Sequence, residues 1–154
     1  MALFRSSKPA KGSGNGPQIG DLTDAERAWL AEHLATMASA GADVADIDSI
    51  GAVFDAQLRT WAAQPEGRRA DPNQMINAIG IAFGAHIGQR TGLQWVLATD
   101  QYGSELALHG QPGNLVMYPT NMIAKRWVGL EYGCMRPLAD ATVQAVVLAQ
   151  HSAE

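Results

Sequence analysis

Cysteine and long apolar runs are scarce in this sequence. Its 154 residues include one cysteine, Cys134, so no disulfide can form within the chain and a reducing compartment suits it. No apolar run approaches the ~20 residues that a membrane-spanning helix needs. The residues after Met1 also lack the apolar core of a signal peptide. We therefore expect a cytoplasmic protein with no membrane partner.

Basic residues are also few. The chain has 11 Lys and Arg against 15 Asp and Glu, which gives a formal net charge of -4. Arg5, Lys8 and Lys11 lie in the first 20 residues, so the remainder is more acidic still. It lacks the clustered cations that neutralise phosphates, and a nucleic-acid partner is not expected.

Motifs for catalysis and metal binding are missing too. The sequence contains no HExxH, CxxC, nucleophile elbow or glycine-rich phosphate loop. Its histidines are not spaced as ligand pairs. Arg136 is a cation that could lower the pKa of Cys134, but a lone cysteine among apolar neighbours is more often inert. We predict no catalytic residues, no metal and no cofactor.

The composition that is present is that of a globular domain. Hydrophobic residues make up 47% and charged residues 17%, and the length suffices for one hydrophobic core. Residues 1–20 are rich in Gly, Ser, Pro and Lys, which predicts a flexible basic tail. We expect residues 21–154 to form a single α+β domain.

Three amphipathic helices are predicted before residue 93. Each begins where a side chain can cap the free N–H groups of the first turn and ends near Gly or Pro. The expected spans are Thr23 to about Gly41, about Asp48 to Gln64, and Asp71 with Pro72 to about Gly92.

Glycines recur every four residues on the third predicted helix, at Gly80, Gly84 and Gly88. Each costs roughly 1 kcal/mol of helix propensity, so close packing must compensate. Neither a P-loop nor a dinucleotide fingerprint fits, because both follow a strand. We predict a groove that admits a neighbouring backbone.

Residues 93–118 alternate in hydrophobicity and predict an antiparallel meander. The expected strands are 93–99, 104–109 and 115–118. A type I turn with a G1 bulge at residues 100–103 would pair Asp100 with Ser104 and Trp95 with His109. One face would then pack on the helices and the other stay mixed and accessible. The helix-facing set is Val96, Ala98, Leu106 and Leu108, and the other includes Trp95, Leu97 and His109.

Two further helices complete the prediction. One is capped by Thr120 or Asn121 and broken by Gly129, and the last opens at Pro137. The expected fold is therefore an α+β domain in which a three-stranded antiparallel β-meander packs against N-terminal and C-terminal helices. The element order is ααα-βββ-αα.

Polar residues gather in this prediction where the helix after the meander returns toward the first turn. The candidate corner consists of Asp100, Tyr102, Asn121, Lys125 and Arg126. It has two interpretations, a salt-bridged seam and a binding site in which two cations hold an anionic group, and the structural one is favoured. Trp95 and His109 join the candidates from the accessible sheet face.

These residues carry a family resemblance. The run from about residue 75 to 126 contains a helix with spaced glycines, a G-x-x-W step into a strand, a D-x-Y-G turn and P-x-x-x-I-x-K-R. The members are Gly80, Gly84, Gly92, Trp95, Asp100, Tyr102, Gly103, Pro119, Ile123, Lys125 and Arg126. This pattern resembles the bacterial domain of unknown function 3806. The resemblance implies a compact α+β domain and supplies no activity, cofactor or catalytic residue.

The functional hypotheses follow from what is absent and from the mixed sheet face. The leading one is a non-catalytic protein-interaction or regulatory module, such as an adaptor or immunity-type protein. The alternative is a small-molecule domain or enzyme that binds an anionic ligand at the Asp100, Tyr102, Lys125 and Arg126 corner. A homo-oligomer that associates through the same face or the glycine groove is the third.

Overall fold

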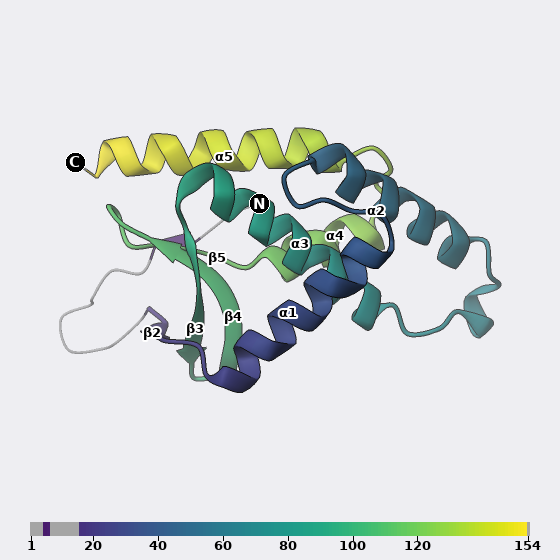
Figure 1. Cartoon of the computed structure of the whole chain (residues 1–154), viewed down its shortest axis with the longest axis horizontal. Helices are drawn as coiled ribbons and strands as arrows, with labels where there is room; N and C mark the ends of the chain where they lie inside the picture. The colour runs from purple at the N-terminus through teal and green to yellow at the C-terminus, as the bar shows by residue number, and fades with distance from the viewer. Residues whose placement is uncertain (1–4, 7–15, 154) are drawn as a thin grey trace.

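The computed structural model describes residues 5–6 and 16–153, and within them the protein is an α+β fold (Figure 1). The elements in chain order are β1 (Arg5–Ser6), β2 (Gln18–Gly20), α1 (Asp24–Ser39), α2 (Ile47–Ala62), the 3-10 turn η1 (Glu66–Arg68), α3 (Asn73–Thr91), β3 (Gln94–Asp100), β4 (Gly103–Gly110), β5 (Leu115–Met117), α4 (Pro119–Val128) and α5 (Met135–Ser152). The sheet lies at one end of the long axis, and α2 with η1 lies at the other.

The sheet is antiparallel and larger than predicted. Its described strands follow the order β1-β5-β4-β3-β2, so the expected three strands and the order ααα-βββ-αα are wrong. The predicted meander forms its centre. β2 pairs with β3 and β1 with β5 through two or three residues each, and such short edges need no alternating side-chain pattern. The rest of the predicted tail, residues 1–4 and 7–15, lies outside the described residues.

The β3–β4 register differs by one residue from the prediction. Asp100 pairs with Gly103 rather than Ser104, and Trp95 pairs with Leu108 rather than His109. The connection is a two-residue loop, because Gly103, at φ +128°, belongs to the ladder instead of forming an unpaired bulge. A one-residue slip moves every side chain of a strand to the other face relative to its partner.

The two sheet faces are therefore composed differently from the prediction. Trp95 and Leu108 join Leu115 and Met117 in the main core beneath the helices. On the other face, Ala98 and Ala107 pack with Val116 in a separate small cluster. The prediction that Val96 and Ala98 face the helices is wrong, as is the placement of Trp95 on an accessible face.

Helix starts agree with the capping signals most fully at α1, and the last helix, α5, begins at Met135 rather than at the predicted Pro137. At α1 the Glu26 N–H donates to Thr23 Oγ1 at 3.2 Å and the Thr23 N–H donates to Glu26 Oε1 at 2.7 Å, which completes the predicted capping box. Asp71 accepts from the N–H of Asn73 at 3.0 Å, but Pro72 is the N-cap and α3 begins at Asn73, so the predicted start at Asp71 with Pro72 lies slightly too early. The predicted cap of α4 at Thr120 or Asn121 is wrong, because Pro119 is already its first residue.

The glycine groove of α3 is confirmed as a packing surface. A Cβ at Gly80 would stand 2.7 Å from Thr120 Cα at the start of α4. At Gly84 it would stand 2.5 Å from the ring of Trp95. Only hydrogen in place of Cβ permits this approach, so the glycines bring α4 and β3 directly onto α3.

The main core extends from the sheet to α2. All five helices bury side chains in it, and Phe54, Phe83 and Trp127 are among the largest fully or almost fully buried ones. Trp127 meets Phe54 edge to face at a centroid distance of 5.8 Å and Trp61 at 5.6 Å. This aromatic group fixes the end of α4 against α2. In the described part of the chain, no helix is long and apolar enough to cross a membrane.

Candidate functional site

The β3–β4 turn holds two of the predicted site residues, Asp100 and Tyr102. Asp100 Oδ1 accepts from the Tyr102 backbone N–H at 2.8 Å, and the Tyr102 side chain is 88% exposed. Both line a hollow of about 260 Å³, whose other lining residues are Ala98, Gly103, Ser104, Glu105 and Tyr118. The ionisable groups in this lining are two carboxylates and two phenols. The hollow therefore lacks the cations that an anionic ligand needs.

The other three residues of the predicted corner lie on α4, and none of them lines this hollow. Asn121 is in the first turn. Lys125 and Arg126 are in the last turn, next to Trp127 and its contact with Phe54 of α2. Figure 1 shows α4 leading away from the sheet toward α2. The structure thus divides the predicted corner between a sheet turn and a helix end.

Trp95 and His109 make contacts that support the fold. The Trp95 ring fills the space above Gly84. His109 Nε2 lies 2.6 Å from Oδ1 of Asn114, in the loop that joins β4 to β5. The two residues sit on opposite faces of the sheet, because Trp95 pairs with Leu108 and His109 with Gln94. They do not form a common site.

An exposed apolar segment, the 128–132 loop, begins at the last residue of α4 and runs on to residue 132. Val128 is 80% exposed, Leu130 47% and Tyr132 46%. Isolated surface leucines are ordinary, but here three large apolar side chains are exposed within five residues. Clusters of exposed apolar side chains are typical of interaction sites. The sequence prediction missed them.

The loop begins in a tight hydrogen-bonded helix end. The Leu130 N–H donates to the Trp127 carbonyl at 3.0 Å and the Glu131 N–H donates to the Arg126 carbonyl at 3.0 Å. This pair of bonds is the Schellman arrangement, which requires a left-handed residue between them. Leu130 takes that position at φ +52°, although glycine is the usual occupant. Leu130 thus holds a strained backbone conformation while about half of its side chain stays exposed.

Contacts with α2 hold the C-terminal end of the loop. The Gly133 N–H donates to Asp55 Oδ1 at 3.0 Å. One turn further along α2, the Arg59 guanidinium lies 5.9 Å from the centroid of the Tyr132 ring, within cation–π range. Contacts within the chain therefore fix both ends of the loop.

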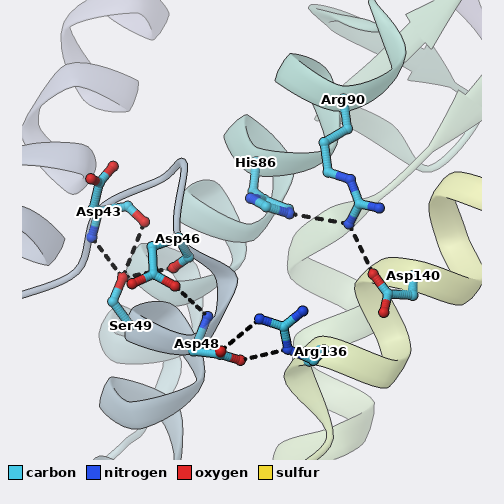
Figure 2. Close-up of polar contacts among 8 residues, drawn as sticks. All are labelled: Asp43, Asp46, Asp48, Ser49, His86, Arg90, Arg136 and Asp140. Atoms are coloured by element: carbon cyan, nitrogen blue, oxygen red, sulfur yellow. Dashed lines mark hydrogen bonds and ion pairs between the residues drawn. The ribbon is translucent and has the colours of Figure 1, made fainter.

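A bidentate ion pair fastens the helix that follows the loop. Arg136 in the first turn of α5 donates from Nε to Asp48 Oδ1 at 2.8 Å and from its terminal nitrogen to Oδ2 at 2.6 Å (Figure 2). The Arg136 hydrogen bond holds the pKa of Asp48 below its ordinary value, and Asp48 in turn raises the pKa of Arg136. The starts of α2 and α5 are joined by this contact.

The same region carries a second polar link, between α3, α5 and the α1–α2 loop. Buried His86 donates from Nδ1 to the Val44 carbonyl at 2.7 Å, and its Nε2 lies 3.5 Å from a terminal nitrogen of Arg90. Arg90 also contacts Asp140 Oδ1 at 3.0 Å (Figure 2). A histidine bonded to backbone in this way positions the loop and leaves no exposed group for chemistry.

Cys134 is not an activated thiol. Burial, together with the charges of Glu131 and Asp55, raises its pKa to about 11, against the opposing influence of Arg126. The cation named by the sequence prediction, Arg136, is engaged with Asp48 instead. Among the described residues no group of three His, Cys, Asp or Glu side chains is placed to hold a metal ion.

The fold and the site define a small α+β domain with an ordered, exposed apolar loop. The family model described as "Domain of unknown function (DUF3806)" matches residues 55–136, more than half of the chain, and the protein belongs to that family. The matched segment extends beyond the predicted run of about 75–126 and includes the 128–132 loop with Asp55 and Arg59. No curated protein and no solved structure matches the chain.

The signal that could have revealed the loop is visible in the sequence. Gly129 and Gly133 bracket the run Leu130–Tyr132, where helical periodicity has already ended at Val128. Apolar side chains between two helix-breaking glycines have no helix face on which to be buried. Periodicity alone, however, does not tell whether a loop folds back onto the core.

Proposed function

We propose that this protein is a non-catalytic protein-interaction or regulatory module, of adaptor or immunity type, that works in the bacterial cytoplasm and docks a partner protein through the 128–132 loop. The observation that carries the proposal is the display of three large apolar side chains on a loop fixed at both ends. Burying them against a partner recovers roughly 25 cal/mol for each Å² of apolar surface removed from water.

Preorganisation supports the same function. The hydrogen bonds of Leu130, Glu131 and Gly133 already fix the backbone, so association orders few additional bonds. Ordering a flexible loop on binding costs affinity, and a loop that is held in advance avoids much of that cost. Aromatic residues are common anchors of such interfaces, and Tyr132 occupies this role here.

The mixed sheet face that first suggested an interaction surface is a weaker candidate. Ala98, Ala107 and Val116 of that face are buried in their own cluster. This burial supports the proposal that the interaction surface is the 128–132 loop rather than the sheet face.

The test is affinity isolation from cells that express the protein, with three baits. These are the unmodified protein, the double variant Val128→Ser with Leu130→Ser, and Leu148→Ser, which alters a leucine 61% exposed on α5. We expect a protein that the first and third baits retain and the double variant loses. Equal recovery on all three baits, or no protein retained by the unmodified one, would refute the proposal.

A further inference from the structure

Charged side chains around the 128–132 loop differ in sign from the chain as a whole. Arg59, Lys125 and Arg126 bring three cations, and Asp55 and Glu131 bring two carboxylates. The Asp55 carboxylate already accepts the Gly133 N–H. The net charge of the chain is -4. The apolar side chains are therefore bordered by charges of both signs with one cation in excess, on a chain that is acidic as a whole.

The rim charges are placed to act on a partner. Lys125 is exposed and lies one helical turn before the end of α4, on the side that leads to Val128 and Gly129. Arg59 stands over Tyr132 from α2. The carboxylate of Glu131 folds back toward the helix end, where its Oε2 lies 3.0 Å from the place of a Cβ on Gly129. Lys125 thus belongs to the α4 end of the loop, and Arg59 stands at its Tyr132 end.

We propose that the partner of the 128–132 loop is a protein surface with an apolar hollow bordered by Asp and Glu side chains. The inference rests on the proposed function and adds the charge of the partner to it. Apolar burial supplies the affinity, and complementary charge at the rim orients the encounter and excludes basic partners.

A membrane surface fits the same loop less well. Anionic headgroups would attract Lys125 and Arg59, but inserting Leu130 and Tyr132 into a bilayer would also bring Glu131, which lies between them in the chain, close to the lipid, even with its carboxylate folded back to Gly129. Carrying a carboxylate toward hydrocarbon is costly, and anionic lipids repel it. A folded protein surface can accommodate one carboxylate at a defined position, whereas a fluid lipid surface has no fixed position for it.

The first experiment selects binders from a phage-displayed library of random peptides, with the unmodified full chain as bait. We expect enriched peptides to combine an aromatic or aliphatic residue with neighbouring Asp or Glu. The bound peptide should lose its affinity for the Val128→Ser, Leu130→Ser double variant and keep it for Leu148→Ser.

The second experiment measures the charge dependence of the best peptide by fluorescence anisotropy. Lys125→Gln should weaken binding about twofold to fivefold at low salt, as expected for one exposed charge pair. Glu131→Gln should strengthen it by a similar factor, and both effects should shrink as salt rises. Arg59→Lys keeps the charge and should change binding less than Arg59→Gln.

The outcomes separate the two proposals. Neutral or basic peptides, or no response to Lys125→Gln and Glu131→Gln, would overturn the acidic partner while the loss in the double variant would still support the docking loop. Binding to vesicles of phosphatidylcholine mixed with phosphatidylserine, lost in the double variant, would replace the protein partner with a membrane. Self-association lost in the same variant would replace it with a second copy of the chain.

Discussion

The β3–β4 turn and the 128–132 loop contain similar kinds of residue. Each exposes a tyrosine, Tyr102 in the turn and Tyr132 in the loop. An aspartate accepts a backbone N–H within the turn, and another accepts the N–H of the residue that follows the loop. Each also contains a residue with positive φ. In the turn that residue is Gly103, and in the loop it is Leu130.

The difference between them is how far their contacts reach. Asp100 bonds to its own turn two residues on, so the turn is a local structure that ends a hairpin. The loop is held by Asp55 and Arg59 of another helix and begins at Trp127 in the main core. Its strained position carries leucine where glycine would suffice. This contrast supports the proposal that the loop serves recognition, whereas the contacts of the turn serve the hairpin.

The largest expected effect concerns the base of the loop. Trp127→Ala should lower the free energy of unfolding by about 3–5 kcal/mol, because it leaves a cavity beside Phe54 and Trp61. Trp127→Phe should cost less, since it keeps a ring and removes an indole N–H that has no hydrogen-bond partner within the described chain. Tyr102→Ala in the turn should change stability by no more than roughly 0.5 kcal/mol. Urea unfolding measures the stability of all three variants. If Tyr102→Ala lost as much stability as Trp127→Ala, the contrast between the local turn and the core-anchored loop would be contradicted.

Substitutions at the positive-φ residues Gly103 and Leu130 should affect the free energy of unfolding differently. Gly103→Ala forces a Cβ into a conformation that L-residues avoid, so a loss of about 1–3 kcal/mol is expected. Leu130→Gly relieves strain at the Schellman position and should leave stability unchanged or raise it by up to roughly 1 kcal/mol. The same variant should bind a partner more weakly. If Leu130→Gly destabilised the protein as Gly103→Ala does, the leucine would be a structural residue.

Helix starts and the glycine groove could be predicted because their causes are local or periodic. Thr23 with Glu26 specifies a cap within four residues, and the spacing of Gly80 and Gly84 specifies one smooth face. Register and edge pairing could not be predicted as well. The turn at residues 100–103 is compatible with two loop lengths, and Gln18–Gly20 has too few residues to show alternation.

The candidate site was the least predictable part. Asp100 and Lys125 are near one another only if α4 returns toward the β3–β4 turn, but the Gly80 contact directs α4 along α3 instead. The exposure of Val128 and Tyr132 depends on which loop atoms meet α2, and this is a tertiary property. Sequence patterns report faces of helices and strands, and they contain little information about a loop between two elements.

The ion pair between Asp48 and Arg136 predicts a smaller, pH-dependent effect on stability. Asp48 has a lowered pKa in the folded protein, so its contribution is present above its unfolded pKa and is lost as pH falls through the folded value. The stability difference between the unmodified protein and Asp48→Asn should therefore be visible at neutral pH and vanish in acid. Asp100→Asn, measured by the same urea titrations, is the comparison in the turn. A difference that grew as pH fell would contradict the assignment.

The smallest effect is expected at Cys134, beside the loop. With its pKa raised to about 11, the thiol should react slowly with iodoacetamide at neutral pH, and the rate should still be rising well above pH 9. Glu131→Gln should lower the pKa slightly, because one of its raising charges is removed. The pH profile of alkylation, compared with an unstructured cysteine peptide, measures this. Fast labelling at neutral pH would show that burial is not the dominant influence.

The most direct test of the docking loop is backbone hydrogen exchange, with and without the selected peptide or an isolated partner. Protection should increase on binding at residues 128–133 and on the exposed side of α2 around Arg59, while exchange at residues 100–103 stays unchanged. Protection confined to residues 100–103, or a bound complex that leaves residues 128–133 exchanging as before, would contradict the assignment of the 128–132 loop as the recognition surface.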